Sequence, residues 1–252
     1  MLKSVRNILI LILCVLTPFV VPQMLSYAAG PGTGAADWSS ARRDTAKLSP
    51  APEDYPGAVI QVFGARTWSW RGNFAIHTWI SMKKSGAYDY HRYEVIGWRA
   101  YRGGEALTHR RGSPDNYWFG NLPELLAEVK GEAAEHLITK IEGVIEAYPH
   151  KYDYRLWPGP NSNSFIAHIG REVPELALDL PPTAIGKDYI GSGIVTAHAV
   201  SGRGFQLSLG GYGGFTLSPV EGAELHLLGL TIGFDFDDVA LKLPGFGRIP
   251  IF

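Results

Sequence analysis

The stretch 74-FAIHTWISM-82 decides the fold, because it is an apolar run of strand length with turn residues on both sides. Gly72-Asn73 precedes it and Lys83-Lys84-Ser85-Gly86 follows it. A second run, from Tyr90 to Trp98, is equally rich in aromatic and β-branched residues, and Gly86 marks a turn between the two runs. These features predict an antiparallel hairpin with His77 in the middle of its first strand.

Further elements are expected on both sides of this hairpin. Upstream, 58-AVIQVF-63 is a strand candidate. Downstream, a long helix is expected from Leu122 to Tyr148, which Gly131 can bend or split, and a second helix from Phe165 to Val173. The apolar residues that keep helical spacing in the long segment are Leu125, Leu126, Val129, Ala133, Leu137, Ile141, Val144 and Ile145.

The C-terminal part has a different pattern. From Gly193 onward, apolar residues alternate with small or polar ones, and Gly210 to Gly214 form a turn cluster. This pattern predicts a β-meander. A parallel sheet is not expected, because parallel strands need helical crossovers that the sequence does not supply. The predicted fold is α+β: an antiparallel sheet packed on helices over residues 58–191, followed by a β-rich region over residues 192–252.

The N-terminus has the pattern of a targeting segment. Lys3 and Arg6 give a positive start, and Ile8 to Val21 is almost wholly apolar. A basic start followed by an apolar run is typical of a secretory signal, and Ser26-Tyr27-Ala28 offers a small-residue cleavage site. The same segment is also about long enough to span a bilayer. Residues 1–29 are therefore a signal peptide or a membrane anchor, residues 30–57 a flexible linker, and the remainder is expected in the periplasm, either anchored to the inner membrane or released.

Composition excludes several kinds of site. The net charge of −1 does not favour a nucleic-acid partner. Cys14 is the only cysteine and lies in the apolar N-terminal run, so the exported part has neither a disulfide nor a cysteine nucleophile. The scattered histidines show no spacing typical of a metal site. No cofactor or metal is expected.

Candidate chemistry lies at His77 and at Asn161-Ser162-Asn163-Ser164-Phe165, where a helix is expected to begin. The order of histidine strand, neighbouring strand, long helix and helix start resembles the circularly permuted papain-like hydrolases and acyltransferases. This group includes the lecithin:retinol acyltransferase-like and peptidoglycan-peptidase-like folds. Their nucleophile helix begins with Asn-Cys-x-x-Phe, and here Ser162 takes the cysteine position. The resemblance implies His77 as base and Ser162 as nucleophile, but a serine hydroxyl needs a general base at the moment of attack.

The resemblance also implies a third group on the next strand, where His91 and Glu94 are the candidates. Their odd separation places them on opposite faces of that strand, so only one of them can face His77. Asn161, Asn163, Trp79 and Trp157 are candidates for lining a cleft.

Each of these residues also has an ordinary structural interpretation. A histidine on a strand is more often packed than catalytic, Ser and Asn before a helix are first of all N-caps, and strand aromatics are more often core. Two functional classes therefore stand side by side. One is a serine-dependent hydrolase or acyltransferase acting on a peptide, lipid or glycan bond of the envelope. The other is a non-catalytic binding or structural module with a degenerate papain-like cleft.

A closer resemblance rests on six segments: FAIHTW (74–79), RYEVIGW (92–98), PD (114–115), WFG (118–120), WPGPNSNSF (157–165) and LPPTAIGKDY (180–189). In these segments the chain resembles one bacterial family, domain of unknown function 3750. That resemblance implies a proteobacterial protein that is membrane-associated or periplasmic, and it implies no activity, substrate or catalytic residue.

Overall fold

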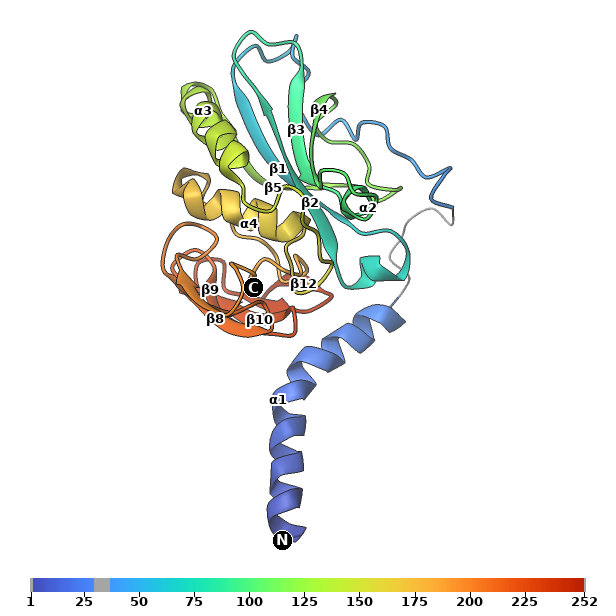
Figure 1. Ribbon diagram of the computed structural model, residues 1–252, viewed down its shortest axis with the longest axis vertical. Coiled ribbons are helices and arrows are strands. Elements are labelled where there is room, and N and C mark those ends of the chain that lie inside the picture. The colour runs from blue at the N-terminus through green and yellow to red at the C-terminus, as the bar shows by residue number, and fades with distance from the viewer. Residues whose placement is uncertain (1, 30–36, 252) are drawn as a thin grey trace.

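The computed structural model describes residues 2–29 and 37–251, which form two antiparallel sheets, two main helices and a protruding N-terminal helix (Figure 1). The α+β class and the antiparallel arrangement expected from the sequence are confirmed.

The first sheet is five-stranded, in the order β4-β3-β2-β1-β5. Its strands are β1 (Val59–Arg66), β2 (Ile76–Lys83), β3 (Tyr90–Val95), β4 (Leu107–Gly112) and β5 (Glu124–Lys130). β2 and β3 form the predicted antiparallel hairpin, and Gly86 has a φ of 72° in the turn between them. The second predicted strand ends earlier than expected, because Trp98 belongs to the short helix α2 (Gly97–Ala100).

The prediction of one long helix from Leu122 is wrong in its first half. Residues Glu124–Lys130 form the edge strand β5, which pairs with β1, and only Glu132–Ala147 form the helix α3. Gly131 divides the two, with a φ of 70° that favours glycine. The free edge of β1 offers backbone partners to the segment, and this pairing overrides the local helical spacing.

Helices α3 and α4 (Ser162–Glu172) cover one face of the first sheet (Figure 1). The buried residues of α3 repeat every three or four positions, at Ala134, Ile138, Ile141 and Ile145. They pack on side chains such as Ile80 of β2, and this interface is the main hydrophobic core.

The opposite face of the sheet holds a smaller core of Phe63, Ala65 and Trp79, with Trp118 packed against it. Residues 41–49 lie over this side of the molecule, within the segment that composition predicts to be a flexible linker. The Asp115 carboxylate accepts hydrogen bonds from Thr45 Oγ1 (2.6 Å), Leu48 N (2.5 Å) and Ser49 N (2.9 Å). This part of the predicted linker is therefore held on the core, whereas residues 30–36 lie outside the described residues.

The C-terminal region forms a seven-stranded antiparallel meander, as the alternation predicts, in the order β12-β11-β10-β9-β8-β7-β6. Two short 3-10 helices, η1 (Ser69–Asn73) and η2 (Pro174–Leu176), complete the described elements. The strands are β6 (Ile194–Ala197), β7 (Phe205–Leu209), β8 (Gly213–Ser218), β9 (Gly222–Leu227), β10 (Leu230–Asp235), β11 (Ala240–Leu243) and β12 (Gly247–Pro250).

The N-terminal helix α1 (Leu2–Ala28) contains Pro18 and Pro22 and changes direction along its length in Figure 1. Its second half contacts the body: Phe19 is buried, the Ser26 hydroxyl donates to Asn73 O (2.8 Å), and Tyr27 stacks on Phe74. The segment Val5–Ala28, with mean hydropathy 2.5, is long and apolar enough to cross a membrane, a property shared by anchors and signal sequences.

Candidate functional site

The start of α4 is built around an asparagine cap. Asn161 Oδ1 accepts hydrogen bonds from Asn163 N (2.9 Å) and Ser164 N (3.1 Å), and Asn161 N donates to Ser164 Oγ (2.7 Å). This reciprocal pattern is a capping box. Asn161 and Ser164 therefore satisfy the free backbone groups of the helix start, and Ser162 is the first helical residue and not the cap.

Asn161 and Asn163 also join three parts of the chain through their side-chain amides. Asn163 Nδ2 donates to Ile76 O (3.1 Å) and Ile185 O (2.9 Å), and Asn161 Nδ2 donates to Ile185 O (3.0 Å). A Cβ at Gly186 would lie 2.4 Å from Asn161 Nδ2, so only glycine fits beside this amide. The WPGPNSNSF and LPPTAIGKDY segments thus have a structural role, since they lock the start of α4 onto β2.

Ser162 has a hydroxyl group that makes no hydrogen bond to any residue within 2–29 or 37–251. Its backbone carbonyl accepts from Thr78 Oγ1 (3.1 Å), which fixes the helix start against β2. The side chain is almost fully buried and lies at the edge of a pocket. Its hydroxyl is therefore positioned at this pocket by the backbone alone.

This pocket, which we call the α4 pocket, has a volume of about 270 Å³. Its walls are mainly apolar and come from η1 and the loop after it, the loop before α4, and the turns at Ile185 and Leu228. The residues that line it are Thr67, Trp70, Arg71, Phe74, Ala75, Ile76, His77, Tyr154, Leu156, Trp157, Asn161, Ser162, Asn163, Ile185 and Leu228. The α4 pocket thus brings together the predicted site residues His77, Ser162, Asn161, Asn163 and Trp157.

His77 nevertheless projects away from α4. Its neighbours along β2, Ile76 and Thr78, contact the start of α4 or the main core, and adjacent strand residues point to opposite faces. The His77 ring stacks on Trp118, with centroids 3.7 Å apart, and its Nε2 lies 2.8 Å from Glu94 Oε2. No hydrogen bond joins the ring to Ser162 in the described part of the chain, so no serine–histidine dyad is formed.

Glu94 is shared by His77 and Arg92, whose Nη2 donates to the same carboxylate oxygen at 2.8 Å. Burial alone would raise the pKa of Glu94, but the Arg92 guanidinium and the His77 hydrogen bond lower it to about 2. Burial lowers the pKa of His77, and this effect outweighs that of Glu94, which raises it. The imidazole is therefore neutral near pH 7. Because an ionised carboxylate can only accept, Nε2 of His77 carries the ring proton and Nδ1 is left as the basic nitrogen.

The structure places Glu94 beside His77 and His91 elsewhere. His91 lies on the other face of β3, where its Nδ1 is 2.9 Å from Nε2 of His109 on β4. Trp79, a candidate for lining the cleft, is fully buried between Phe63 and the Arg92 guanidinium and does not line the α4 pocket. Trp157 does line it and is 40% exposed.

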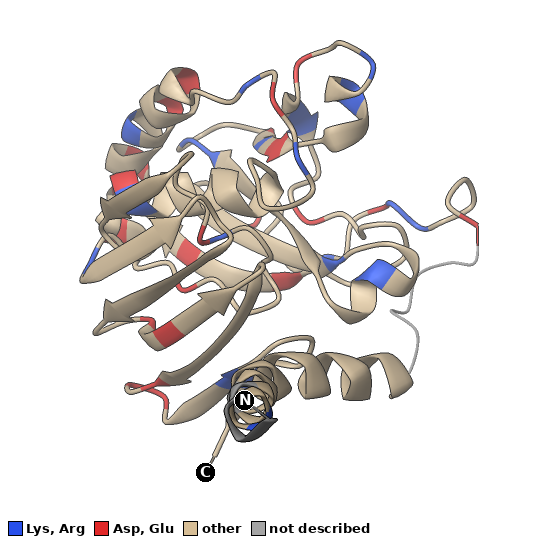
Figure 2. Ribbon diagram, turned by 60° about the horizontal axis from the view of Figure 1, so that its bottom comes forward, with Lys and Arg blue, Asp and Glu red and all other residues tan. Residues whose placement is uncertain are grey.

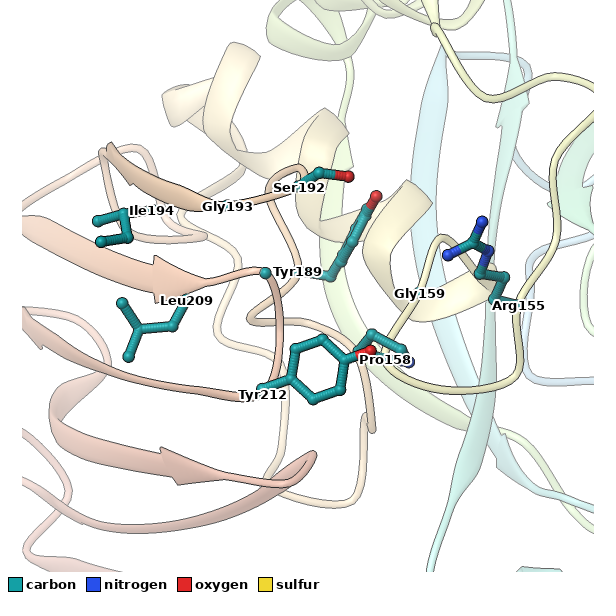
Figure 3. A pocket seen from close by; sticks show the side chains of 10 residues that line it. Arg155, Pro158, Gly159, Tyr189, Ser192, Gly193, Ile194, Leu209 and Tyr212 are labelled. Carbon is teal, nitrogen blue, oxygen red and sulfur yellow. The ribbon is translucent and has the colours of Figure 1, made fainter.

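The loop before α4 borders a second pocket on its other side, with a volume of about 410 Å³ (Figure 3). Figure 3 shows Arg155, Pro158 and Tyr189 on one side of it and Leu209 of β7 on the other, with the Tyr212 ring lying beside Pro158. The loop is wedged tightly here: a Cβ at Gly159 would lie 2.8 Å from the Tyr189 ring. This pocket therefore lies where the loop before α4 packs against the C-terminal sheet.

Sequence reasoning missed a buried ionic cluster between the C-terminal sheet and residues 179–188. Lys187 Nζ donates to Glu224 Oε1 (2.8 Å), and Lys242 Nζ donates to Asp179 Oδ2 (2.7 Å) and to Glu224 Oε1 (3.0 Å). Burial would raise the pKa of Glu224, but the two ammonium groups lower it to about 2. The only available signal was charged residues alternating with apolar ones along the strands. Across residues 2–29 and 37–251, no cluster of His, Cys, Asp or Glu has the arrangement of a metal site.

Comparison with known proteins identifies the family. The chain matches no curated protein and no solved structure significantly. A family profile described as "Protein of unknown function (DUF3750)" matches residues 57–189, which is more than half of the 252 residues and contains the first sheet, both main helices and the α4 pocket segments 157–165 and 180–189. The chain belongs to the DUF3750 family.

Proposed function

We propose that this chain is an exported protein of the bacterial envelope, held at the membrane by α1, whose α4 pocket binds the apolar chain of an envelope lipid without transforming it. The observation that carries this proposal is the position of the pocket. Phe74 lines it and also stacks on Tyr27 at the end of α1. An apolar pocket that adjoins the end of a membrane-length helix is within reach of a lipid chain.

The chemistry of the α4 pocket suits an amphipathic ligand. Trp70, Phe74, Leu156 and Leu228 supply apolar walls, while the Ser162 hydroxyl supplies a polar group with no protein partner described. Pockets of this kind bind the bulk of a ligand by apolar contact and orient it with a few polar groups. We expect Ser162 to hydrogen-bond an ester or headgroup oxygen at one end of the lipid chain.

We further propose that the first sheet with α3 and α4 is a permuted papain-like core that has lost its chemistry. The order of His77 strand, antiparallel strand, α3 and α4 supports this likeness. The absence of a hydrogen bond between Ser162 and His77 in the described chain, with His77 held by Trp118 and Glu94, supports the loss of activity.

Photo-crosslinking tests the binding proposal. The full chain is reconstituted in nanodiscs that contain a phosphatidylethanolamine with a photoreactive group on its acyl chain, and adducts are mapped by mass spectrometry. We expect adducts on Phe74 or Trp157 that Ile185→Trp, which fills the pocket, abolishes. Leu122→Trp, at an exposed leucine outside the pocket, is the matched control. Adducts confined to α1 in the unmodified chain would refute the proposal.

A serine-dependent hydrolase or acyltransferase is the second candidate, favoured by one observation. Glu94 fixes the His77 tautomer so that Nδ1 is basic, as the carboxylate of a catalytic triad fixes its histidine. In this mechanism Ser162 Oγ attacks an ester carbonyl, and its proton passes to Nδ1 of His77 and then to the departing alcohol as the ester C–O bond breaks. The Ser162 backbone N–H, which has no acceptor in the described chain, stabilises the oxyanion. Water or a second alcohol then takes the acyl group from Ser162 and returns the proton to the serine oxygen.

A fluorophosphonate probe separates the two candidates. The binding module predicts no labelling of the full chain. The enzyme predicts labelling that both Ser162→Ala and His77→Gln remove, since members of one catalytic unit fail together. Ser162→Cys gives a second readout: a thiol that reacts with iodoacetamide no faster than free cysteine supports the module, and fast reaction that depends on His77 supports the enzyme.

A further inference from the structure

An antiparallel sheet in a soluble protein usually buries its apolar face and exposes its polar face. The C-terminal sheet does the reverse. On the inner face of the sheet, residues paired across neighbouring strands form one row. Every residue of this row is polar or charged, apart from one glycine. The row is Gln206, Thr216, Glu224, Gly233, Lys242 and Arg248. All but Gly233 and Arg248 are almost fully buried, and they face the ionic cluster and α4.

The outer face is wholly apolar along its central rows. One row runs across the sheet through Phe205, Leu217, Ala223, Phe234, Leu241 and Ile249. The next contains Leu207, Phe215, Leu225 and Ile232. Neither row contains a charged residue, and Leu217 and Leu225 are 56% and 48% exposed. An apolar patch of this extent on the surface of a protein marks an interaction site.

Helix α1 indicates which partner covers this face. It contacts β10, and Pro18 together with Phe215, Leu217, Leu225 and Leu241 lines an open groove of about 500 Å³ along the sheet. Figure 2, in which this side of the molecule comes forward, shows α1 running beside the sheet. A Cβ at Gly245, in the turn between β11 and β12, would lie 2.7 Å from Ser26 Cβ of α1. The apolar face and the membrane-length helix therefore form one continuous apolar surface.

The length of α1 supports the same partner. The membrane-length segment begins at Val5. Its residues 5–17, which precede Pro18, rise about 20 Å at about 1.5 Å per residue. The hydrocarbon core of a bilayer is about 30 Å thick. The residues that complete the span are those that lie against the C-terminal sheet, so a spanning α1 brings the outer face of the sheet to the depth of the lipid chains.

We propose that the outer face of the C-terminal sheet rests in the lipid bilayer as a second membrane contact beside α1. The proposal rests on the membrane anchoring proposed above, and it assigns lipid acyl chains as the occupant of the apolar face. The sheet then meets the bilayer with side chains only. Its backbone hydrogen bonds are made between strands, apart from the edges at β6 and β12, as a membrane surface requires.

Fluorescence quenching in the full chain tests this contact. Leu217→Cys and Leu225→Cys are each made in a Cys14→Ser background and labelled with an environment-sensitive fluorophore. Each is reconstituted in vesicles of phosphatidylethanolamine and phosphatidylglycerol. We expect doxyl-labelled lipid to quench both probes strongly and aqueous iodide to quench them weakly. Tyr88→Cys, at a residue that is 87% exposed in the turn between β2 and β3, is the control and should show the reverse.

Two outcomes overturn the proposal. Quenching of Leu217 and Leu225 probes by iodide, to the same extent as the Tyr88 probe, shows that the face is in water. Shielding from both quenchers shows that another protein surface, such as a second copy of the chain, covers it. A probe on the native Cys14 reports anchoring separately: if doxyl lipid quenches it and not the sheet probes, α1 is in the bilayer and only the second contact fails. Near-ultraviolet circular dichroism confirms that each variant is folded.

Discussion

His77 Nε2 lies 2.8 Å from Glu94 Oε2, on the face of the first sheet that points away from α4. The same carboxylate oxygen accepts a hydrogen bond from Arg92, so the buried Arg92 guanidinium and the neutral His77 imidazole share one acceptor. This arrangement defines His77 as part of a polar cluster under Trp118 and makes its role in stability directly testable.

Glu94→Gln should destabilise the fold by about 3–5 kcal/mol, because it leaves the buried Arg92 guanidinium without its counter-charge. Urea unfolding at neutral pH measures this loss. Glu142→Gln, which breaks the exposed pair with Lys84, is the control and should cost no more than about 1 kcal/mol. Equal effects of the two substitutions would show that the Glu94 pair is not buried in solution.

Stability should fall as the pH drops below about 6.5, the ordinary pKa of histidine. Burial lowers the folded-state pKa values of His77 and His226, so the unfolded chain takes up protons in this range that the folded chain does not. The slope is at most about 1.4 kcal/mol per pH unit for each histidine. Unfolding free energies measured between about pH 7.5 and pH 5.5 should show a smaller slope for His77→Gln. The exposed His136 gives the control substitution, His136→Gln, which should keep the full slope.

Asn161→Ala should lower the free energy of unfolding by more than the loss of a helix cap alone, which usually costs about 0.5–2 kcal/mol. The substitution also removes the hydrogen bond from the Asn161 side-chain amide to Ile185 O. Ser162→Ala should be nearly neutral, because its hydroxyl has no partner in the described chain. Thermal or urea unfolding of the two variants side by side provides the comparison. A larger loss for Ser162→Ala than for Asn161→Ala would contradict the assignment of the cap.

Glu224→Gln should destabilise the protein by about 3–5 kcal/mol, because Lys187 and Lys242 lose the carboxylate that they share. The pKa of Glu224 is lowered to about 2, so its contribution is complete above the ordinary value near 4.5 and is lost as the pH falls towards 2. Glu175→Gln, in an exposed pair with Lys140, should have an effect below about 1 kcal/mol. Similar unfolding midpoints for the two variants would argue against a buried cluster.

The orientation of the chain in the membrane is testable with reporter fusions at the C-terminus. A reporter that works only in the periplasm should be active when it is fused to the C-terminus, because Lys3 and Arg6 favour a cytoplasmic N-terminus. A reporter that is active only in the cytoplasm is the control, and its activity would refute export. The mass of the purified protein distinguishes a retained α1 from a signal peptide cleaved after Ala28.

Local sequence determined the elements whose signals are carried by neighbouring residues. The apolar run around His77, the turn at Gly86 and the alternation after Gly193 predicted the hairpin and the C-terminal meander, because strand periodicity and turn chemistry act over a few residues. The Asn161 region predicted a helix start for the same reason. The family resemblance was likewise carried by short segments, and the profile match over residues 57–189 confirms it.

Tertiary structure decided what depends on partners distant in sequence. Residues 124–130 have helical spacing but form a strand, because β1 offers them an edge to pair with. Only one of His91 and Glu94 could face His77, and the pairing of β3 with β2 and β4 selects Glu94.

The C-terminal sheet shows the same division most clearly. Alternation determined that its strands have one polar and one apolar face, because successive side chains point to opposite sides. Which face is buried was decided by Lys187 and Asp179, distant in sequence, which pair with Glu224 and Lys242 and draw the polar face inward. The apolar face is left outside beside α1, because a buried charge must lie against its partner, whereas an apolar side chain can be covered equally well by protein or by lipid.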